Sequence, residues 1–311
     1  MDLNDRRGLK AAAREARAKA KYDPKKLMLI HAGITAAAGL LVTLVGYLLQ
    51  LWIEDTGGLG GVGTRTMLET AQNVLNQLFS LVLPFWQIGF VYATVQIIRG
   101  RRTEPDSLQE GFRRAWPVLK TQLWMALFTC GLIFACFYAA YFLYAMTPLS
   151  EGLLTALMNG SEEELLAAME EAMLPITIMM LPPLLVVGTY FVYRMRLVDY
   201  VVMDESGIGG IGAIRRGWKL TKGNFGKLFK LDLSYWWYYL LMGLTVLVAY
   251  GDLILTLLGI SLPWSKTDSS YGCLALSYVL QFLLLWWKGA QVQLTYAAFY
   301  EAALPKETPN E

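Results

Sequence analysis

The stretch TQLWMALFTCGLIFACFYAAYFLYAM, residues 121–146, contains no charged residue and is rich in leucine, phenylalanine, tyrosine and alanine. A helix needs about 20 consecutive apolar residues to cross the hydrocarbon core of a bilayer. A backbone exposed to lipid must also satisfy its own hydrogen bonds, which favours a helix over an open strand. This stretch therefore predicts a transmembrane helix.

Five further stretches have the same character, and short charged segments separate them. The six predicted spans are approximately Leu27–Ile53, Leu78–Ile98, Thr121–Met146, Ile176–Tyr193, Leu231–Leu258 and Tyr271–Trp287. They are longer than barrel strands of about 10 residues, and buried helices of a large soluble core are the weaker alternative. The sequence predicts an all-α, polytopic membrane protein with six transmembrane helices in residues 27–303.

The distribution of positive charge gives an orientation. If the N-terminus is cytoplasmic, 25 of the 27 lysines and arginines fall in the inner segments, whereas the outer loop 147–175 carries six glutamates. This is the asymmetry that the positive-inside rule describes. We therefore expect both termini in the cytoplasm.

The segments outside the spans have distinct compositions. We expect residues 1–26 to form a basic cytoplasmic N-terminal arm without a cleavable signal peptide, and residues 304–311 to form a short cytoplasmic tail. In the outer loop, Ser161 followed three residues later by Glu164 has the pattern of a capping box. It predicts a short amphipathic helix over residues 161–173, lying on the outer surface.

Two of the predicted inner loops carry the same short motif. Arg113-Arg114-x-Trp116 follows span two, and Arg215-Arg216-x-Trp218 follows span four. Together with the order of the spans, the motif predicts a parallel internal repeat of two hairpins, an arrangement found in transporters with sites at the repeat interface. Convergence on a basic, tryptophan-anchored membrane interface explains the motif equally well.

The segment GIGGIGAIRRGWKLTKGNFGKLF, residues 207–229, contains the G-x-G-x-x-G spacing of a dinucleotide-binding loop. Such a loop follows a strand, whereas a predicted span precedes this one, so we reject nucleotide binding. The cations after the glycines are typical of an interfacial amphipathic helix, and the KGNFGK part (222–227) predicts a turn. Two interpretations remain open, a plain topology anchor and a site for anionic lipid headgroups or a partner protein. The candidate residues of such a headgroup or partner site are Arg113, Arg114, Trp116, Arg215, Arg216, Trp218, Lys219, Lys222 and Lys227.

Three stretches carry a family resemblance: LKAAAREA (Leu9–Ala16), MDES with the following AIRRGWKLTKGNFGKLFKLDLSYW, and the late AAFYEAAL. With these residues the chain resembles, over most of its length, the uncharacterised bacterial membrane proteins catalogued as domain of unknown function 975. The resemblance implies a six-span fold and no established activity.

The residue sets that catalysis requires are missing from the sequence. His31 is the single histidine, the three cysteines suggest no disulfide or metal framework, and neither a G-x-S-x-G elbow nor a Walker A motif is present. We therefore expect a protein that is not an enzyme and has neither a cofactor nor a metal site.

Charged residues lie near the ends of the spans instead of at their centres. Asp199 and Asp232 are near inner ends, where Arg194, Arg196 or Lys230 can pair with them. Ionisable groups inside a membrane are usually functional, so this placement argues against ion-coupled transport. Four glutamines can still line a path or join helices, namely Gln87, Gln96, Gln122 and Gln281.

Three functions compete on this evidence. The first is a non-catalytic protein of the bacterial cell membrane that engages anionic inner-leaflet lipid or a partner protein through its basic loops. The second is a transporter, permease or accessory subunit of a transport complex, which requires a cavity between spans two–three and four–five. The third, an intramembrane enzyme, is disfavoured. Nucleic acid is not an expected partner, and homo-oligomers remain open.

Overall fold

The computed structural model describes residues 3, 5–55, 61–205, 207–257 and 266–305. Within these ranges every regular element is a helix. In chain order they are α1 (Arg6–Lys19), α2 (Pro24–Asp55), α3 (Gly61–Ile98), η1 (Pro105–Gln109), α4 (Glu110–Arg113), α5 (Ala115–Ala145), η2 (Pro148–Ser150), α6 (Glu151–Asn159), α7 (Glu162–Met195), α8 (Val198–Asp204), α9 (Ile211–Thr221), α10 (Phe225–Leu233), α11 (Trp236–Ala249), α12 (Gly251–Leu257), α13 (Lys266–Leu284), the π-helical η3 (Leu285–Gly289) and α14 (Ala290–Ala303).

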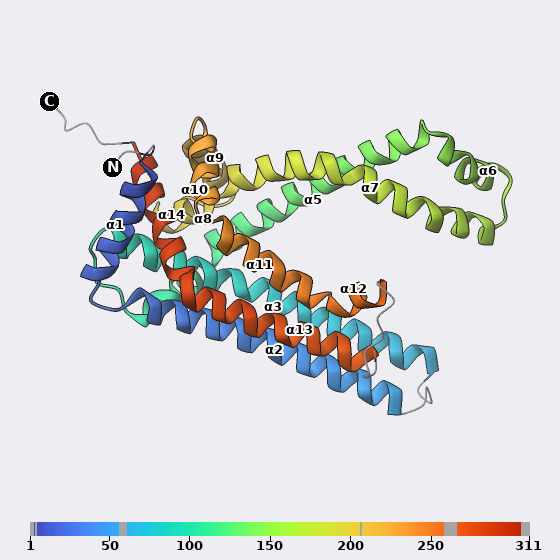
Figure 1. Cartoon of the computed structure of the whole chain (residues 1–311), viewed down its shortest axis with the longest axis horizontal. Helices are drawn as coiled ribbons and strands as arrows, with labels where there is room; N and C mark the ends of the chain where they lie inside the picture. The colour runs from blue at the N-terminus through green and yellow to red at the C-terminus, as the bar shows by residue number, and fades with distance from the viewer. Residues whose placement is uncertain (1–2, 4, 56–60, 206, 258–265, 306–311) are drawn as a thin grey trace.

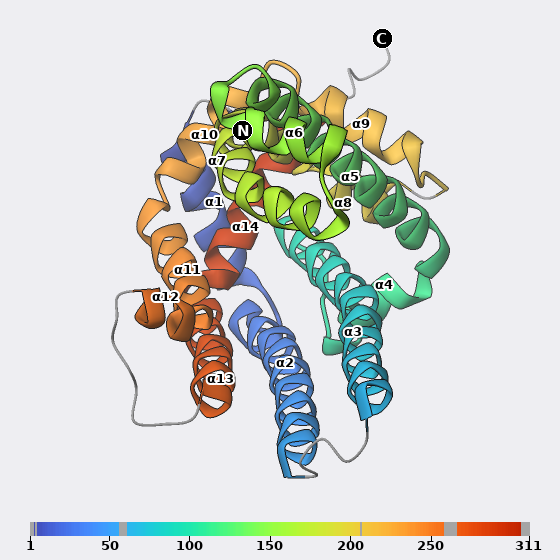
Figure 2. The same ribbon diagram turned by 90° about the vertical axis from the view of Figure 1, so that its right-hand side faces the viewer.

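The long helices form two groups. Helices α2, α3, α11 and α13 pack into one bundle, while α5 and α7 form an antiparallel hairpin that diverges from it (Figure 1; Figure 2). The shorter helices α1, α8, α9, α10 and α14 gather where the two groups meet (Figure 1). We call this the junction end of the molecule.

Five helical segments are long and apolar enough to cross a membrane. They are Pro24–Trp52, Asn73–Ile98, Ala115–Ala145, Glu163–Asp204 and Ser269–Ala303, and they match five of the six predicted spans to within one residue at any end that falls short. Exposed leucine, phenylalanine and valine side chains are numerous along these helices, as lipid contact requires. The prediction of an all-helical protein with several long apolar helices is confirmed for the described residues.

The predicted span Leu231–Leu258 does not form one continuous helix, because the chain bends sharply within it. Helices α10 and α11 meet at an angle of 75° and qualify as a sixth span only when taken together. At the break, the amide of Tyr235 donates to the carbonyl of Asp232 (2.8 Å), and Lys10 Nζ donates to the carbonyl of Ser234 (3.1 Å). Helix α11 has 14 residues, which span about 21 Å of the roughly 30 Å hydrocarbon core.

The segment 161–173 is helical and begins as predicted. Ser161 Oγ accepts from the amide of Glu164 (3.3 Å), and the Glu164 carboxylate accepts from the amide of Ser161 (3.1 Å), which completes the capping box. The helix does not stop after residue 173, however. It continues as α7 through three prolines to Met195, so this segment is the first part of a long helix.

The N-terminal segment is folded against the core. Helix α1 packs on α14 and α3, and its Leu9 and Ala13 side chains are fully buried. Most of the charged residues of α1 are exposed, namely Arg6, Arg7, Arg14, Glu15 and Lys19, which is why the sequence resembles a solvated arm. Most of the predicted tail, residues 306–311, lies outside the described residues.

Candidate functional site

The two RR-x-W loops meet around the end of α8. Arg114 donates to the carbonyl of Met203 (2.7 Å), and Arg216 forms an ion pair with Glu205 (2.9 Å). The second arginine of each motif therefore holds the same segment, residues 203–205. Arg114 and Arg216 thus stabilise the end of α8, a role that the sequence motif did not predict.

In the first RR-x-W loop, the charge of Arg113 is compensated by neighbouring carboxylates. Arg113 lies between Asp106 (2.6 Å) and Glu110 (2.7 Å), and its shared hydrogen bonds with these carboxylates raise its pKa further. Trp116 is 64% exposed, with Lys120 Nζ 4.8 Å from its ring centre. This loop is consistent with a membrane interface, because an exposed tryptophan is typical of such a position.

Helix α9 separates its apolar and charged faces. Its buried residues are Ala213, Ile214, Gly217, Leu220 and Thr221. Arg215, Lys219 and Lys222 are exposed, at spacings of four and three residues, and within the described part of the chain none of them lies in an ion pair. We call these three residues the cationic stripe. Two other candidates lie beside it: Lys227 on α10 is half-buried, and Trp218 packs between Tyr190 and Phe191.

The glycines before α9 serve close packing. Gly210 has a positive φ of 63°, and its amide donates to Thr121 Oγ1 on α5 (2.7 Å). A Cβ on Gly209 would lie 3.0 Å from Pro117 Cα. Of the three glycines in the G-x-G-x-x-G spacing, Gly209 is therefore explained by its contact with α5, and Gly207 by its positive φ of 87°. The predicted turn in KGNFGK is confirmed, since Gly223 has a φ of 79° between α9 and α10.

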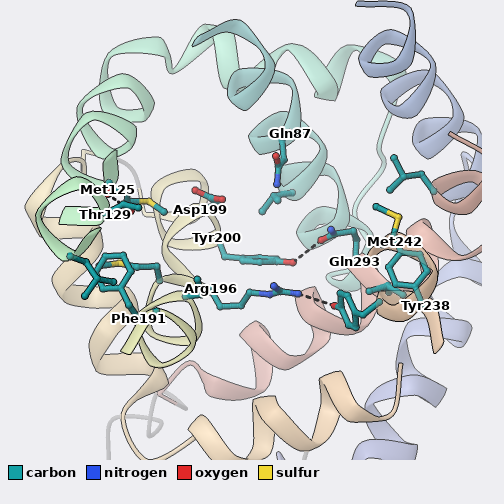
Figure 3. Close-up of a pocket in the computed structure, with 18 of the residues that line it drawn as sticks. Gln87, Met125, Thr129, Phe191, Arg196, Asp199, Tyr200, Tyr238, Met242 and Gln293 are labelled. Atoms are coloured by element: carbon teal, nitrogen blue, oxygen red, sulfur yellow. Dashed lines mark hydrogen bonds between the residues drawn. The ribbon is translucent and has the colours of Figure 1, made fainter. Parts of the chain in front are cut away.

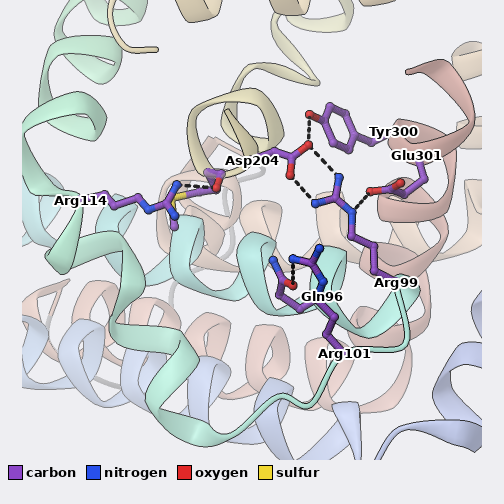
Figure 4. A network of polar contacts seen from close by, with 8 residues as sticks. Gln96, Arg99, Arg101, Arg114, Asp204, Tyr300 and Glu301 are labelled. Carbon is purple, nitrogen blue, oxygen red and sulfur yellow. Dashed lines mark hydrogen bonds and ion pairs between the residues drawn. The ribbon is translucent and has the colours of Figure 1, made fainter. Parts of the chain in front are cut away.

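An ion cluster joins three helices at the junction end (Figure 4). Both Nη atoms of Arg99 bind the Asp204 carboxylate, with Nη2 to Oδ2 at 2.8 Å, and Nε binds Glu301 Oε1 at 2.6 Å. The Tyr300 hydroxyl donates to Asp204 (2.9 Å). The hydrogen bonds that Arg99 donates to Asp204, together with the negative charges of Asp204 and Glu301, raise the pKa of its guanidinium.

A cavity of about 660 Å³ lies between the hairpin and the bundle (Figure 3). This is within the range of roughly 300–1,000 Å³ of small-molecule sites. Much of its wall is apolar, as in Met125, Leu132, Ile133, Leu184, Phe191, Val192, Met242 and Leu285. Its polar lining comprises Gln87, Thr129, Arg196, Asp199, Tyr200, Tyr238, Tyr239 and Gln293.

The polar groups of this cavity are linked across helices. Arg196 Nη2 donates to the Tyr239 hydroxyl (2.9 Å) and lies 4.0 Å from Asp232. The predicted pairing of Asp232 with a nearby arginine is thus confirmed. Asp199 accepts from the Gln122 amide (3.3 Å), and Tyr200 donates to Gln293 (3.4 Å).

The predicted glutamines have different positions. Gln87 lines the cavity and Gln122 binds Asp199, so two of the four serve this site. Gln96 is buried and accepts from Arg101 (3.2 Å), whereas Gln281 lies at a separate pocket beside α11. The presence of a polar residue within a predicted span singles out Gln87 and Gln122 in the sequence. That both serve one cavity depends on how the helices pack.

One protein-family model matches residues 1–306, and its description is "Protein of unknown function (DUF975)". The comparisons with curated proteins and with solved structures returned no match. Segments that carried the resemblance are adjacent in space, because Leu9, Met203 and Phe299 belong to one buried cluster. The family pattern thus coincides with the packing of the junction end.

Proposed function

The chain belongs to the DUF975 family, whose description names no activity, and from its geometry we propose a non-catalytic protein of the bacterial cell membrane that binds anionic lipid headgroups through the cationic stripe. In this proposal the junction end and both termini face the cytoplasm, in keeping with the distribution of lysine and arginine. The cationic stripe then lies at the height of the inner-leaflet headgroups.

The observation that carries this proposal is the exposure of Arg215 and Lys219 on the face of α9 opposite its buried face, and of Lys222 directly after the helix. A basic residue near an anionic leaflet contributes about 1 kcal/mol of attraction. Ile211 (42% exposed) and Phe229 (47% exposed) provide apolar surface nearby. A helix with such a composition binds at the interface through both charge and apolar burial.

The test compares retained lipid in two variants of equal charge. In the stripe variant Arg215, Lys219 and Lys222 are replaced by glutamine. The control variant replaces by glutamine three exposed cations, namely Arg7 on α1, Lys21 just after it and Lys26 at the start of α2. Each protein is incubated in detergent with phosphatidylglycerol or phosphatidylcholine, and native mass spectrometry counts the bound lipids.

We expect wild type and the control to keep phosphatidylglycerol, and the stripe variant to lose it. Phosphatidylcholine should be retained weakly by all three proteins, because it carries no net charge. Equal retention of phosphatidylglycerol in all three proteins would contradict the proposal. So would an equal loss in the two variants, because only total charge would then matter.

Transport is a second candidate function, and the cavity favours it. The cavity lies between α3–α5 and α7–α11, the location that the transporter hypothesis requires. Transport requires the cavity to open to each side of the membrane in turn.

With Cys130, Cys136 and Cys273 replaced by alanine, Thr129→Cys places a thiol on the cavity wall. We expect a membrane-impermeant maleimide to label it from both sides of a proteoliposome, whereas labelling from one side only contradicts transport.

A further inference from the structure

The cavity contains a carboxylate without a cationic partner. Within the described residues Asp199 forms no ion pair, and its hydrogen bond comes from the neutral amide of Gln122. Asp199 lines the cavity and is half-buried there (Figure 3). A buried charge that lacks an ionic partner is costly, so a cation that entered the cavity would be stabilised at this position.

The positive charge of Arg196 is already compensated. Its guanidinium lies 4.0 Å from Asp232 and 4.4 Å from the centre of the Tyr296 ring. It also donates to the Tyr239 hydroxyl. The cavity lining therefore holds one arginine and one aspartate. Because Asp232, outside the lining, compensates Arg196, the uncompensated negative charge of the cavity is that of Asp199.

Aromatic rings line the same cavity. Phe191, Tyr200, Tyr238 and Tyr239 come from three different helices, α7, α8 and α11. The faces of such rings attract cations, and the attraction is larger where water is excluded. A carboxylate, several aromatic rings and a long apolar wall together match a cation with a hydrophobic body.

We propose that this cavity binds an organic cation, of the ammonium or phosphonium class, with a substantial apolar body. The charge lies against Asp199, and the apolar body lies along the wall formed by Leu132, Ile133, Leu184 and Val192. This inference goes beyond headgroup binding at α9, because it uses another site and a ligand of opposite charge.

The probe for this proposal is tetraphenylphosphonium, and its matched control is tetraphenylborate, an anion of nearly the same size and shape. Binding to the purified protein in an uncharged detergent is measured by equilibrium dialysis against protein-free micelles. We expect saturable binding of tetraphenylphosphonium and no saturable binding of tetraphenylborate. Preference for tetraphenylborate, or no saturable binding of either ion, overturns the proposal.

Two variants locate the bound cation. Asp199→Asn keeps the shape of the side chain and removes its charge, so the dissociation constant for tetraphenylphosphonium should rise about tenfold, as the loss of about 1.4 kcal/mol implies. Gly188→Leu fills the cavity, where a Cβ would meet only Leu184 Cδ1 at 3.8 Å, and binding should be lost.

Asp106→Asn removes a carboxylate from the surface helix η1 and should bind the probe like wild type. Tryptophan fluorescence during thermal unfolding checks that all variants are folded. Unchanged affinity in the folded Asp199→Asn variant would place the cation elsewhere and reject this site. The headgroup proposal is unaffected by that result, because its readout is lipid retained at α9.

Discussion

Replacing Arg99 with glutamine is expected to lower the free energy of unfolding by about 3–5 kcal/mol. Arg99 bridges Asp204 and Glu301 in the ion cluster of Figure 4. Their side chains are only 21%, 15% and 25% exposed, respectively. The variant leaves two carboxylates close together without the cation that hydrogen-bonds both of them, and water reaches them poorly.

The chain contains a matched control for this variant. Arg113 also bridges two carboxylates, Asp106 and Glu110, but its side chain is 57% exposed. Exposed ion pairs contribute about 0–1 kcal/mol, so Arg113→Gln should cost no more than that. Unfolding by sodium dodecyl sulfate in mixed micelles, followed by tryptophan fluorescence, measures both variants.

A second substitution distinguishes charge from packing. Adding Asp204→Asn to Arg99→Gln removes one of the uncompensated carboxylates, and part of the lost stability should return. Equal losses for Arg99→Gln and Arg113→Gln would show that the ion cluster is not the stabilising element. A double variant no more stable than Arg99→Gln would assign the loss to packing.

The sequence predicts those features that depend on neighbouring residues. Hydropathy over a window locates the spans, because burial in lipid is a property of each helix alone. The Ser161–Glu164 capping box and the turn at Gly223 are likewise local, and both are confirmed. The break at Ser234–Tyr235 is harder to predict from the sequence, because the apolar pattern continues across it and the Lys10 contact comes from α1.

The ion cluster and the cavity depend on contacts between distant segments. Arg99, Asp204 and Glu301 each stand at a helix end, where a charge is unremarkable. Only the packing of α3, α8 and α14 brings them together. The roles of the RR-x-W arginines likewise cannot be predicted from the motif alone. Arg215 and Arg216 are adjacent in sequence, but Arg215 is exposed and Arg216 binds Glu205.

Leu9→Ala is expected to cost about 2–5 kcal/mol of stability, the range for truncation of a fully buried leucine. Leu9 is 0% exposed and belongs to the buried cluster that contains Met203 and Phe299. Its loss leaves a cavity beneath α1. The same detergent titration measures the effect, and Arg7→Ala, an exposed position on the same helix, serves as the control.

The helix itself gives a second readout. If α1 is held mainly by Leu9 and Ala13, the Leu9→Ala variant should release it more often, and trypsin should cleave at Arg14 and Arg17 faster than in wild type. Cleavage after local opening follows the free energy of that opening. A charged arm that lay free in solution would be cut equally fast in wild type, Arg7→Ala and Leu9→Ala. That result would contradict the docking of α1 against α14.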